Sequence, residues 1–174
     1  MKKLTAAIAA LALYFSASAF GPEPTNDVTN LMKPTDAKTV SAAKVGRQIT
    51  SAFKKNYSQA TELSWKEKEG LYFAYFKHQG EDLMVAYTPD AELFAVARQI
   101  KLADLPGAVS QKIAEKYSDC TFSSQATEIE MDGYKGIYLA VDNKNSTRLV
   151  KFYQDGEDEV IQKTKKKVLV GSVM

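Results

Sequence analysis

The sequence predicts an α+β fold of two tandem units, each a helix followed by a four-stranded antiparallel sheet, with the helices packed on one sheet face. Three observations support this prediction. Two apolar stripes at four-residue spacing indicate two helices. Each stripe is followed by four short strand-like runs with turn residues between them. Positions in the first half also match positions 60 to 65 residues later, which is typical of an internal duplication.

The first residues have the pattern of a secretory signal peptide. Lys2 and Lys3 precede an apolar run over 4–15, which is too short to span a membrane, and 17–19 is a small-residue cleavage site. We therefore expect residues 1–19 to be removed, leaving no membrane anchor and a periplasmic or secreted protein; a short membrane anchor is the alternative. The only cysteine, Cys120, lies far from the cleavage site, which argues against a lipid anchor.

The remaining chain is long enough for one domain. Removing 19 of the 174 residues leaves 155, and this length supports a real hydrophobic core. The 23 basic residues lose Lys2 and Lys3, so 21 basic residues balance 21 acidic ones. We therefore expect no binding to nucleic acid. Residues 20–39 are rich in Pro, Thr, Asn and Asp and are predicted to form a flexible leader, and 168–174 form a C-terminal tail.

The predicted domain spans 40–167, with a first unit over about 40–100. Val45, Ile49, Phe53 and Tyr57 form one apolar stripe, which predicts a helix over about 41–57. Turn residues then separate four expected strands, at about 62–66, 71–78, 82–88 and 93–98.

The second unit, over about 101–167, repeats this order. Asp104 is a plausible N-cap and Pro106 suits a first helical turn. The second stripe consists of Leu105, Val109, Ile113 and Tyr117. Strands are expected at about 122–131, 134–142, 147–153 and 159–165.

A series of aromatic and turn residues in both units resembles a known family. In the first unit the series is Ala52-Phe53, 57–60, Trp65 and 70–76, and in the second it is 104–106 and 152–156. The sequence is similar to the PepSY-like family of β-lactamase-inhibitor-like proteins, which are small exported proteins of Bacteroidetes. The resemblance covers about 40–165. It departs from the pattern at Ser58 and Ala91, where a proline and a glycine are common.

The resemblance implies helices on one face of an antiparallel sheet and an opposite face that docks on an enzyme. We assign Tyr72, Ala74 and Phe76 to the helix-covered face, because Phe76 aligns with Leu139 in the apolar series of the second unit. The other face is rich in Tyr and Met, which are enriched in protein interfaces. The candidate partner-binding residues are Phe73, Tyr75, Lys77, Met84, Tyr138, Lys151 and Tyr153. Coverage of this face by the leader, the tail or the other unit is an alternative, as is a reversed assignment of the two faces.

The sequence offers little for catalysis or metal binding. His78 is the only histidine and has no nearby cysteine, so no catalytic residues are proposed. Two Cys or His residues in all are too few for a zinc site. Glu128, Glu130 and Asp132 alternate along a strand and offer carboxylates of the kind that calcium binds, but no loop of oxygen ligands accompanies them. We expect neither a cofactor nor a metal.

These observations favour an exported, non-catalytic binding module. The specific hypothesis is a protein inhibitor of an exported peptidase or β-lactamase-like hydrolase, acting through the aromatic sheet face. The alternative is a cell-envelope carrier of a small lipid, glycan or peptide ligand on the same face. An enzyme is the least favoured class, and the identity of the protein partner is open.

Overall fold

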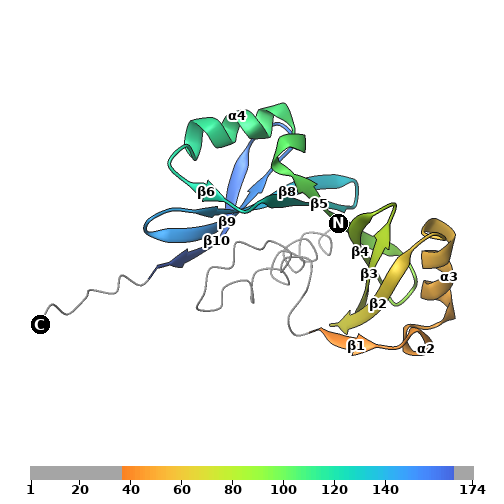
Figure 1. Cartoon of the computed structure of the whole chain (residues 1–174). Coiled ribbons are helices and arrows are strands. Elements are labelled where there is room, and N and C mark those ends of the chain that lie inside the picture. Colours follow the sequence, from red (N-terminus) through yellow and green to blue (C-terminus); the bar gives the residue numbers. More distant parts are fainter. Residues whose placement is uncertain (1–36, 167–174) are drawn as a thin grey trace, which may run out of the picture.

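The computed structural model describes residues 37–166, and these form one antiparallel sheet with helices on one side (Figure 1). The predicted signal peptide, most of the predicted leader and the C-terminal tail lie outside the described residues. The strand order is β1-β2-β3-β4-β5-β7-β8-β9-β10, and β6 pairs with β8. Among the described residues, no helix is long and apolar enough to cross a membrane.

The first half differs from the predicted single helix at one glycine. Gly46 has φ 90°, a conformation that L side chains rarely adopt, and it divides the predicted helix into two. Strand β1 includes Lys38 and Thr39, which the sequence assigned to the leader. The elements are β1 (Lys38–Val40), α2 (Ala42–Val45), α3 (Arg47–Asn56), β2 (Thr61–Lys68), β3 (Leu71–His78), β4 (Glu81–Tyr87) and β5 (Leu93–Lys101).

In the second half, the helix begins later than predicted. Asp104 belongs to a short 3-10 helix, and Pro106 with extended backbone occupies the N-cap position of α4. The run predicted as one strand over 122–131 is divided into β6 and β7. The elements are η2 (Leu102–Asp104), α4 (Gly107–Lys116), β6 (Thr121–Phe122), β7 (Gln125–Met131), β8 (Tyr134–Asp142), β9 (Ser146–Phe152) and β10 (Asp158–Lys165).

The predicted fold class, an α+β fold of two tandem helix-plus-four-strand units, is wrong. The described chain is mostly one ten-stranded antiparallel sheet, with 52% of residues in strands and 21% in helices. The strands of the two halves meet where β5 pairs with β7, from Val96↔Glu130 to Lys101↔Gln125. Two separate sheets would leave both of these strands with an unpaired edge, and their pairing satisfies those backbone groups.

Two apolar clusters lie on the side of the sheet that carries the helices. In the first half, Phe53 of α3 packs edge-on against Trp65 and Phe76, with ring centroids 5.4 and 4.9 Å apart. In the second half, Val109 of α4 packs in a cluster with Leu139 and the other buried residues of β8 and β9. These contacts confirm the predicted helix-covered face for Tyr72, Ala74 and Phe76, and Val85 and Tyr87 of β4 belong to the same cluster.

A buried carboxylate ties α4 to the edge strand β10. The Asp158 side chain is only 4% exposed. It accepts hydrogen bonds from Lys116 Nζ at 2.7 Å and from Tyr117 Oη at 2.6 Å. Burial alone would raise the pKa of Asp158, but these two donors outweigh burial and hold the pKa below its usual range.

Candidate functional site

A third apolar cluster covers the centre of the sheet on the side opposite the helices. The strand register places Tyr75, Met84 and Ala97 side by side on β3, β4 and β5, and Ala97 lies beside Ile129 of β7. We call this surface the helix-free face. Its buried members are Phe73, Met84, Ala86, Ala95, Ala97, Ile129, Tyr138 and Leu149.

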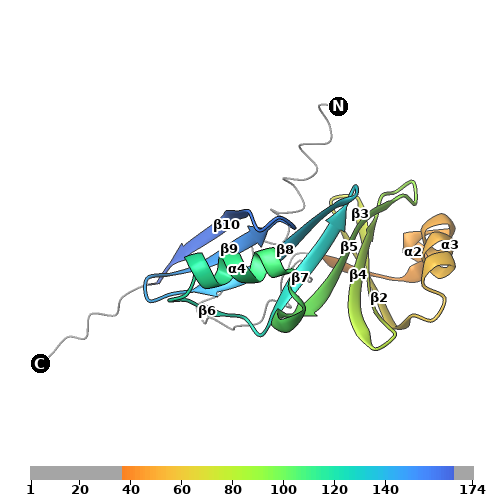
Figure 2. The same ribbon diagram turned by 90° about the horizontal axis from the view of Figure 1, so that it is seen from above.

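The burial of the helix-free face is not accounted for by any described helix. Met84, Ala86 and Ala97 have no exposed surface. The partly buried hydrophobic residues around them all belong to strands, namely Leu71, Tyr75, Phe94, Met131, Ala140 and Ile161. By contrast, Figure 2 shows α3 and α4 over opposite ends of the other side of the sheet, with β5 and β7 between them. Within residues 37–166, the helix-free face is therefore an apolar surface that only its own strands border.

The middle of the helix-free face is lined by small side chains. Ala86, Ala95 and Ala97 lie on the neighbouring strands β4 and β5, and we call these three residues the alanine trough. Beyond Ile129, Gly136 continues the same row on β8. A Cβ atom at Gly136 would lie 2.8 Å from Lys151 Cε and 3.2 Å from a ring carbon of Tyr138. Small side chains therefore lie in the middle of this face, among larger ones such as Phe73 and Tyr138.

Two hydroxyl groups of this face are buried and have no hydrogen-bond partner among residues 37–166. Thr127 has no exposed surface and pairs with Tyr138 of β8 on this face, and its Oγ1 atom has no partner. Tyr75 Oη is also buried without a partner. Burial raises the pKa of Tyr75 well above its usual range, so the phenol stays neutral and can both donate and accept. Buried polar groups in folded proteins are nearly always satisfied, so each exception needs an explanation.

The structure brings four of the seven candidate residues together. Phe73, Tyr75, Met84 and Tyr138 all contribute to the helix-free face, with Phe73 and Met84 fully buried rather than exposed. Burial, with smaller contributions from Tyr153 and Glu159, raises the pKa of Tyr138 to about 12.

The other three candidates are partly exposed and make local contacts. The ammonium of Lys77 lies 3.0 Å from Glu62 Oε1. Lys151 Nζ lies 4.4 Å from the ring centroid of Tyr153, and Tyr153 Oη donates to Glu159 at 3.1 Å. Their part in binding a partner stays a prediction.

Sequence reasoning missed the contribution of the two central strands. Ala95, Ala97, Thr127 and Ile129 come from β5 and β7, which the tandem-unit prediction placed in separate sheets. A signal was present in the run Phe94-Ala95-Val96-Ala97, where large and small side chains alternate and therefore face opposite sides.

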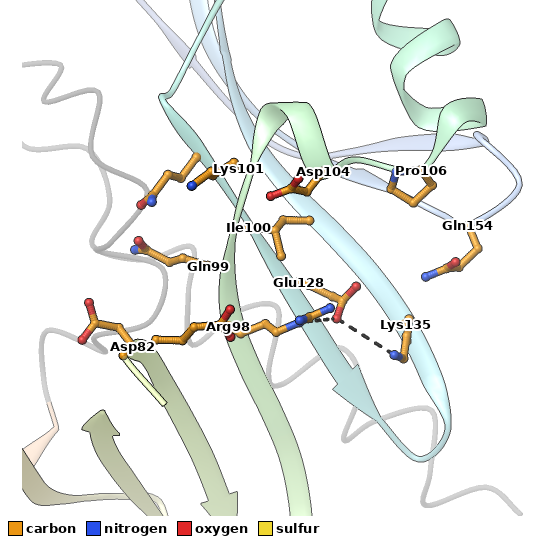
Figure 3. Close-up of a pocket in the computed structure, with 13 residues that line it drawn as sticks. Asp82, Arg98, Gln99, Ile100, Lys101, Asp104, Pro106, Glu128, Lys135 and Gln154 are labelled. Atoms are coloured by element: carbon orange, nitrogen blue, oxygen red, sulfur yellow. Dashed lines mark hydrogen bonds and ion pairs between the residues drawn. The ribbon is translucent and has the colours of Figure 1, made fainter. Parts of the chain in front are cut away.

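A polar hollow lies on the helix-bearing side, beside β5 and β7 (Figure 3). Its volume is about 910 Å³, and it is lined mainly by charged and amide side chains. Arg98 Nε donates to Glu128 Oε1 at 2.8 Å, and Lys135 Nζ lies 4.0 Å from the same oxygen and 3.2 Å from Glu130 Oε2. These cations pair with Glu128 and Glu130, two of the three carboxylates that the sequence suggested for calcium. Among residues 37–166, no group of three or more His, Cys, Asp or Glu side chains could hold a metal.

The two residues considered for nucleophilic chemistry lie in different clusters. His78 stacks edge-on with Tyr57, with ring centroids 5.8 Å apart, and belongs to the aromatic group under α3. Cys120 packs against the cluster under α4, where its Sγ accepts from Arg148 Nη2 at 3.3 Å. The described chain therefore offers no Cys–His pair.

Solved structures from Bacteroides share this architecture. A BLIP-like protein of Bacteroides fragilis NCTC 9343 matches with a TM-score of 0.57 and 19% identity, over 76% of this chain and 96% of that chain. The chain shares the fold of a BLIP-like protein. A protein of Bacteroides eggerthii DSM 20697, described as "putative periplasmic", matches with a TM-score of 0.59 and 24% identity, over 68% and 86% of the two chains. A DUF2874 family protein of Bacteroides ovatus ATCC 8483 matches with a TM-score of 0.60 and 18% identity, over 69% and 86%.

These matches support the β-lactamase-inhibitor-like part of the sequence resemblance at the level of the fold. The PepSY-like assignment has no such support and stays a prediction. No family model and no curated protein match this chain.

Proposed function

We propose that this protein is an exported, non-catalytic binding module that docks a protein partner on the helix-free face. The observation that carries the proposal is a pair of buried hydroxyls, Tyr75 Oη and Thr127 Oγ1, that have no hydrogen-bond partner among residues 37–166 and lie on an apolar face whose middle is lined by alanine. An unsatisfied buried hydroxyl costs about 1–3 kcal/mol, so a partner that supplies hydrogen bonds to both hydroxyls would recover this cost on binding.

The mechanism that this surface supports is steric. A bulky partner side chain fills the alanine trough, and polar groups of the partner satisfy Tyr75 and Thr127. Tyr138 supplies a large side chain with a polar end, of the kind that dominates binding energy in interfaces. A partner hydrolase docked in this way would have its substrate excluded by the bulk of the sheet.

The fold shared with the BLIP-like protein supports an inhibitor of an exported peptidase or β-lactamase-like hydrolase. The signal-like pattern of 1–19 supports a periplasmic or secreted location. Fold likeness alone is a weak warrant for function, so the test must measure binding and inhibition directly.

The proposal is tested with the chain 20–174 as bait in envelope extract. The test variant carries Tyr75→Ala and Tyr138→Ala. The control variant carries Leu63→Ala and Val160→Ala, which truncate two exposed apolar residues, 42% and 43% exposed, outside the helix-free face. A protein captured by the wild type and the control but not by the test variant is then purified, and its hydrolase activity is assayed with and without the module.

Because Tyr75→Ala and Tyr138→Ala open cavities, a gentler variant, Tyr75→Phe with Thr127→Val, keeps the shape of the face and removes only the unpartnered hydroxyls. Equal capture by all four baits would contradict the proposal. Native mass spectrometry of the purified chain distinguishes a protein-binding module from a small-ligand carrier, since a carrier would retain a small ligand on this face.

A further inference from the structure

The neighbouring strands β4 and β5 separate from one another at one end of the sheet. Their pairing stops at Leu83↔Arg98. Beyond this pair, β4 stays with β3 as far as Glu81, while β5 stays with β7 as far as Lys101. Figure 2 shows the two strands diverging toward this end. The sheet is therefore split into a wedge, which closes where Leu83 meets Arg98.

The polar hollow of Figure 3 includes this wedge. One wall consists of Gly80, Glu81 and Asp82, and the other consists of residues 99–101. The hollow has a volume of about 910 Å³, which lies within the range of ligand-binding sites. Along an antiparallel strand, backbone groups are directed to the two sides in turn, so each wall presents N–H and C=O groups that no strand within 37–166 pairs across the wedge. Such an unpaired edge is a template for another extended chain.

We propose that the wedge binds the free C-terminus of an extended peptide, which pairs with β5 through its backbone and directs its terminal carboxylate to Arg98. An inserted chain cannot run past Leu83 and Arg98, because β4 and β5 are paired with each other there. The wedge therefore selects the end of a chain over an internal segment. None of the residues that line the hollow belongs to the cluster of the helix-free face, so this site is independent of the proposed function.

Arg98 determines which end of the peptide is bound. Its Nε donates to Glu128 Oε1 at 2.8 Å, its side chain is 44% exposed, and its two Nη atoms make no hydrogen bond within residues 37–166. Four N–H groups of the guanidinium thus remain for a carboxylate, which they can bind in a bidentate geometry. Lys135 Nζ, 4.0 Å from the same oxygen of Glu128, adds a second positive charge that would repel a terminal ammonium.

The direction of the peptide follows from this contact. With its carboxylate at Arg98 and its preceding residues beside Lys101, the peptide runs antiparallel to β5. This is the orientation of every strand pair in the described sheet, and antiparallel pairing is slightly more stable per residue than parallel pairing. The other edge of the peptide then faces Glu81 and Asp82 of β4.

The open end of the hollow favours a basic residue in the peptide. Glu81, Asp82 and Asp104 are exposed and line this part, against one lysine, Lys101. Because Lys101 lies three residues beyond Arg98, the peptide residue near these carboxylates lies about three residues before its C-terminus. Charge complementarity therefore favours lysine or arginine at that position.

NMR of the 15N-labelled chain 20–174 tests the site with a defined probe. The probe is acetyl-Gly-Lys-Val-Ala-Val with a free C-terminal carboxylate, and its reference is the same peptide with a C-terminal amide. The test variant is Arg98→Gln. The matched control is Arg47→Gln, which makes the same change at an exposed arginine of α3 outside the hollow. Both arginines are exposed, so we expect both variants to fold.

We expect the free-acid peptide, at up to about 10 mM, to shift the amide signals of 99–101 and to bind at least about tenfold more tightly than the amide. Arg98→Gln should weaken binding of the free acid at least about tenfold, and Arg47→Gln should leave it within about twofold. Equal affinities of the two peptides would overturn capture of a C-terminus. Shifts confined to other residues, or no shifts, would overturn the site itself.

The variant Tyr75→Phe with Thr127→Val keeps this experiment separate from the test of the helix-free face. It changes no residue of the hollow, so peptide binding should persist in it. A loss of peptide binding in this variant would also overturn the assignment to the wedge. Capture of a protein partner through the helix-free face is measured independently, and its outcome leaves the wedge unaffected.

Discussion

Replacing Thr127 with valine tests whether its buried hydroxyl is kept for a partner. Thr127 has no exposed surface, and its Oγ1 has no hydrogen-bond partner in the part of the chain that the structure describes, so folding removes the hydroxyl from water without compensation there. An uncompensated hydroxyl costs about 1–3 kcal/mol. Valine has nearly the same shape and an equally favourable strand propensity. We therefore expect Thr127→Val to stabilise the folded chain by about 1–2 kcal/mol.

Thr147 provides the matched control on the neighbouring part of the sheet. It is 9% exposed, and its hydroxyl donates to Asp142 Oδ1 at 2.7 Å. Thr147→Val removes a hydrogen bond to a charged group and should destabilise the chain by about 1–2 kcal/mol. The same substitution, Thr to Val, is thus expected to raise the free energy of unfolding at position 127 and to lower it at position 147.

Urea unfolding of the chain 20–174 measures both effects. With a slope of about 2 kcal/mol/M, the midpoint should rise by about 0.5–1 M for Thr127→Val and fall by a similar amount for Thr147→Val, with unchanged slopes. A fall for Thr127→Val as large as that for Thr147→Val would refute the reasoning, since the Thr127 hydroxyl would then have a partner in the free protein.

Three further predictions follow from the contacts described above. Tyr117→Phe removes the 2.6 Å hydrogen bond to Asp158 and should cost about 1.5–3 kcal/mol in the free energy of unfolding, measured by denaturation; a loss below about 0.5 kcal/mol would contradict it. Because the folded pKa of Asp158 is lowered, its contribution to stability should be complete above about pH 4 and be lost as the pH falls through the folded pKa. Asp158→Asn should therefore reduce the pH dependence of the free energy of unfolding between about pH 2 and 5. An unchanged pH dependence would be contrary evidence. Gly136→Ala should displace the flexible end of Lys151, cost less than about 1 kcal/mol and weaken partner binding, as calorimetry with the captured partner would show; unchanged affinity would mean that this part of the face is not used.

The sequence was sufficient for most local elements. Short strand-like runs bounded by turn residues predicted β3 over 71–78 and β8 over 134–142, and both bounds are confirmed. The alignment of Phe76 with Leu139 in the apolar series of the second unit also predicted which sheet face the helices cover. These features depend on neighbours along the chain, so periodicity reveals them. The break at Gly46 was missed because one glycine within an apolar stripe does not distort the period.

The arrangement of the strands could not be predicted in the same way. Pairing of β5 with β7 joins segments on either side of η2 and α4, and no local pattern distinguishes this join from two separate edges. Because the alanine trough and Thr127 lie on both sides of the join, the central part of the candidate site was missed with it. The unpartnered state of Thr127 Oγ1 depends on neighbours from other strands, which a sequence pattern does not report.

The most direct test of the account is the affinity of the captured partner for two variants of the chain 20–174, measured by calorimetry. Two anchors worth about 2 kcal/mol or more predict a loss of at least about a hundredfold for Tyr75→Ala with Tyr138→Ala. Leu63→Ala with Val160→Ala, outside the helix-free face, should stay within about twofold of the wild type. Equal affinities for the two variants would contradict the claim that the helix-free face is the binding surface.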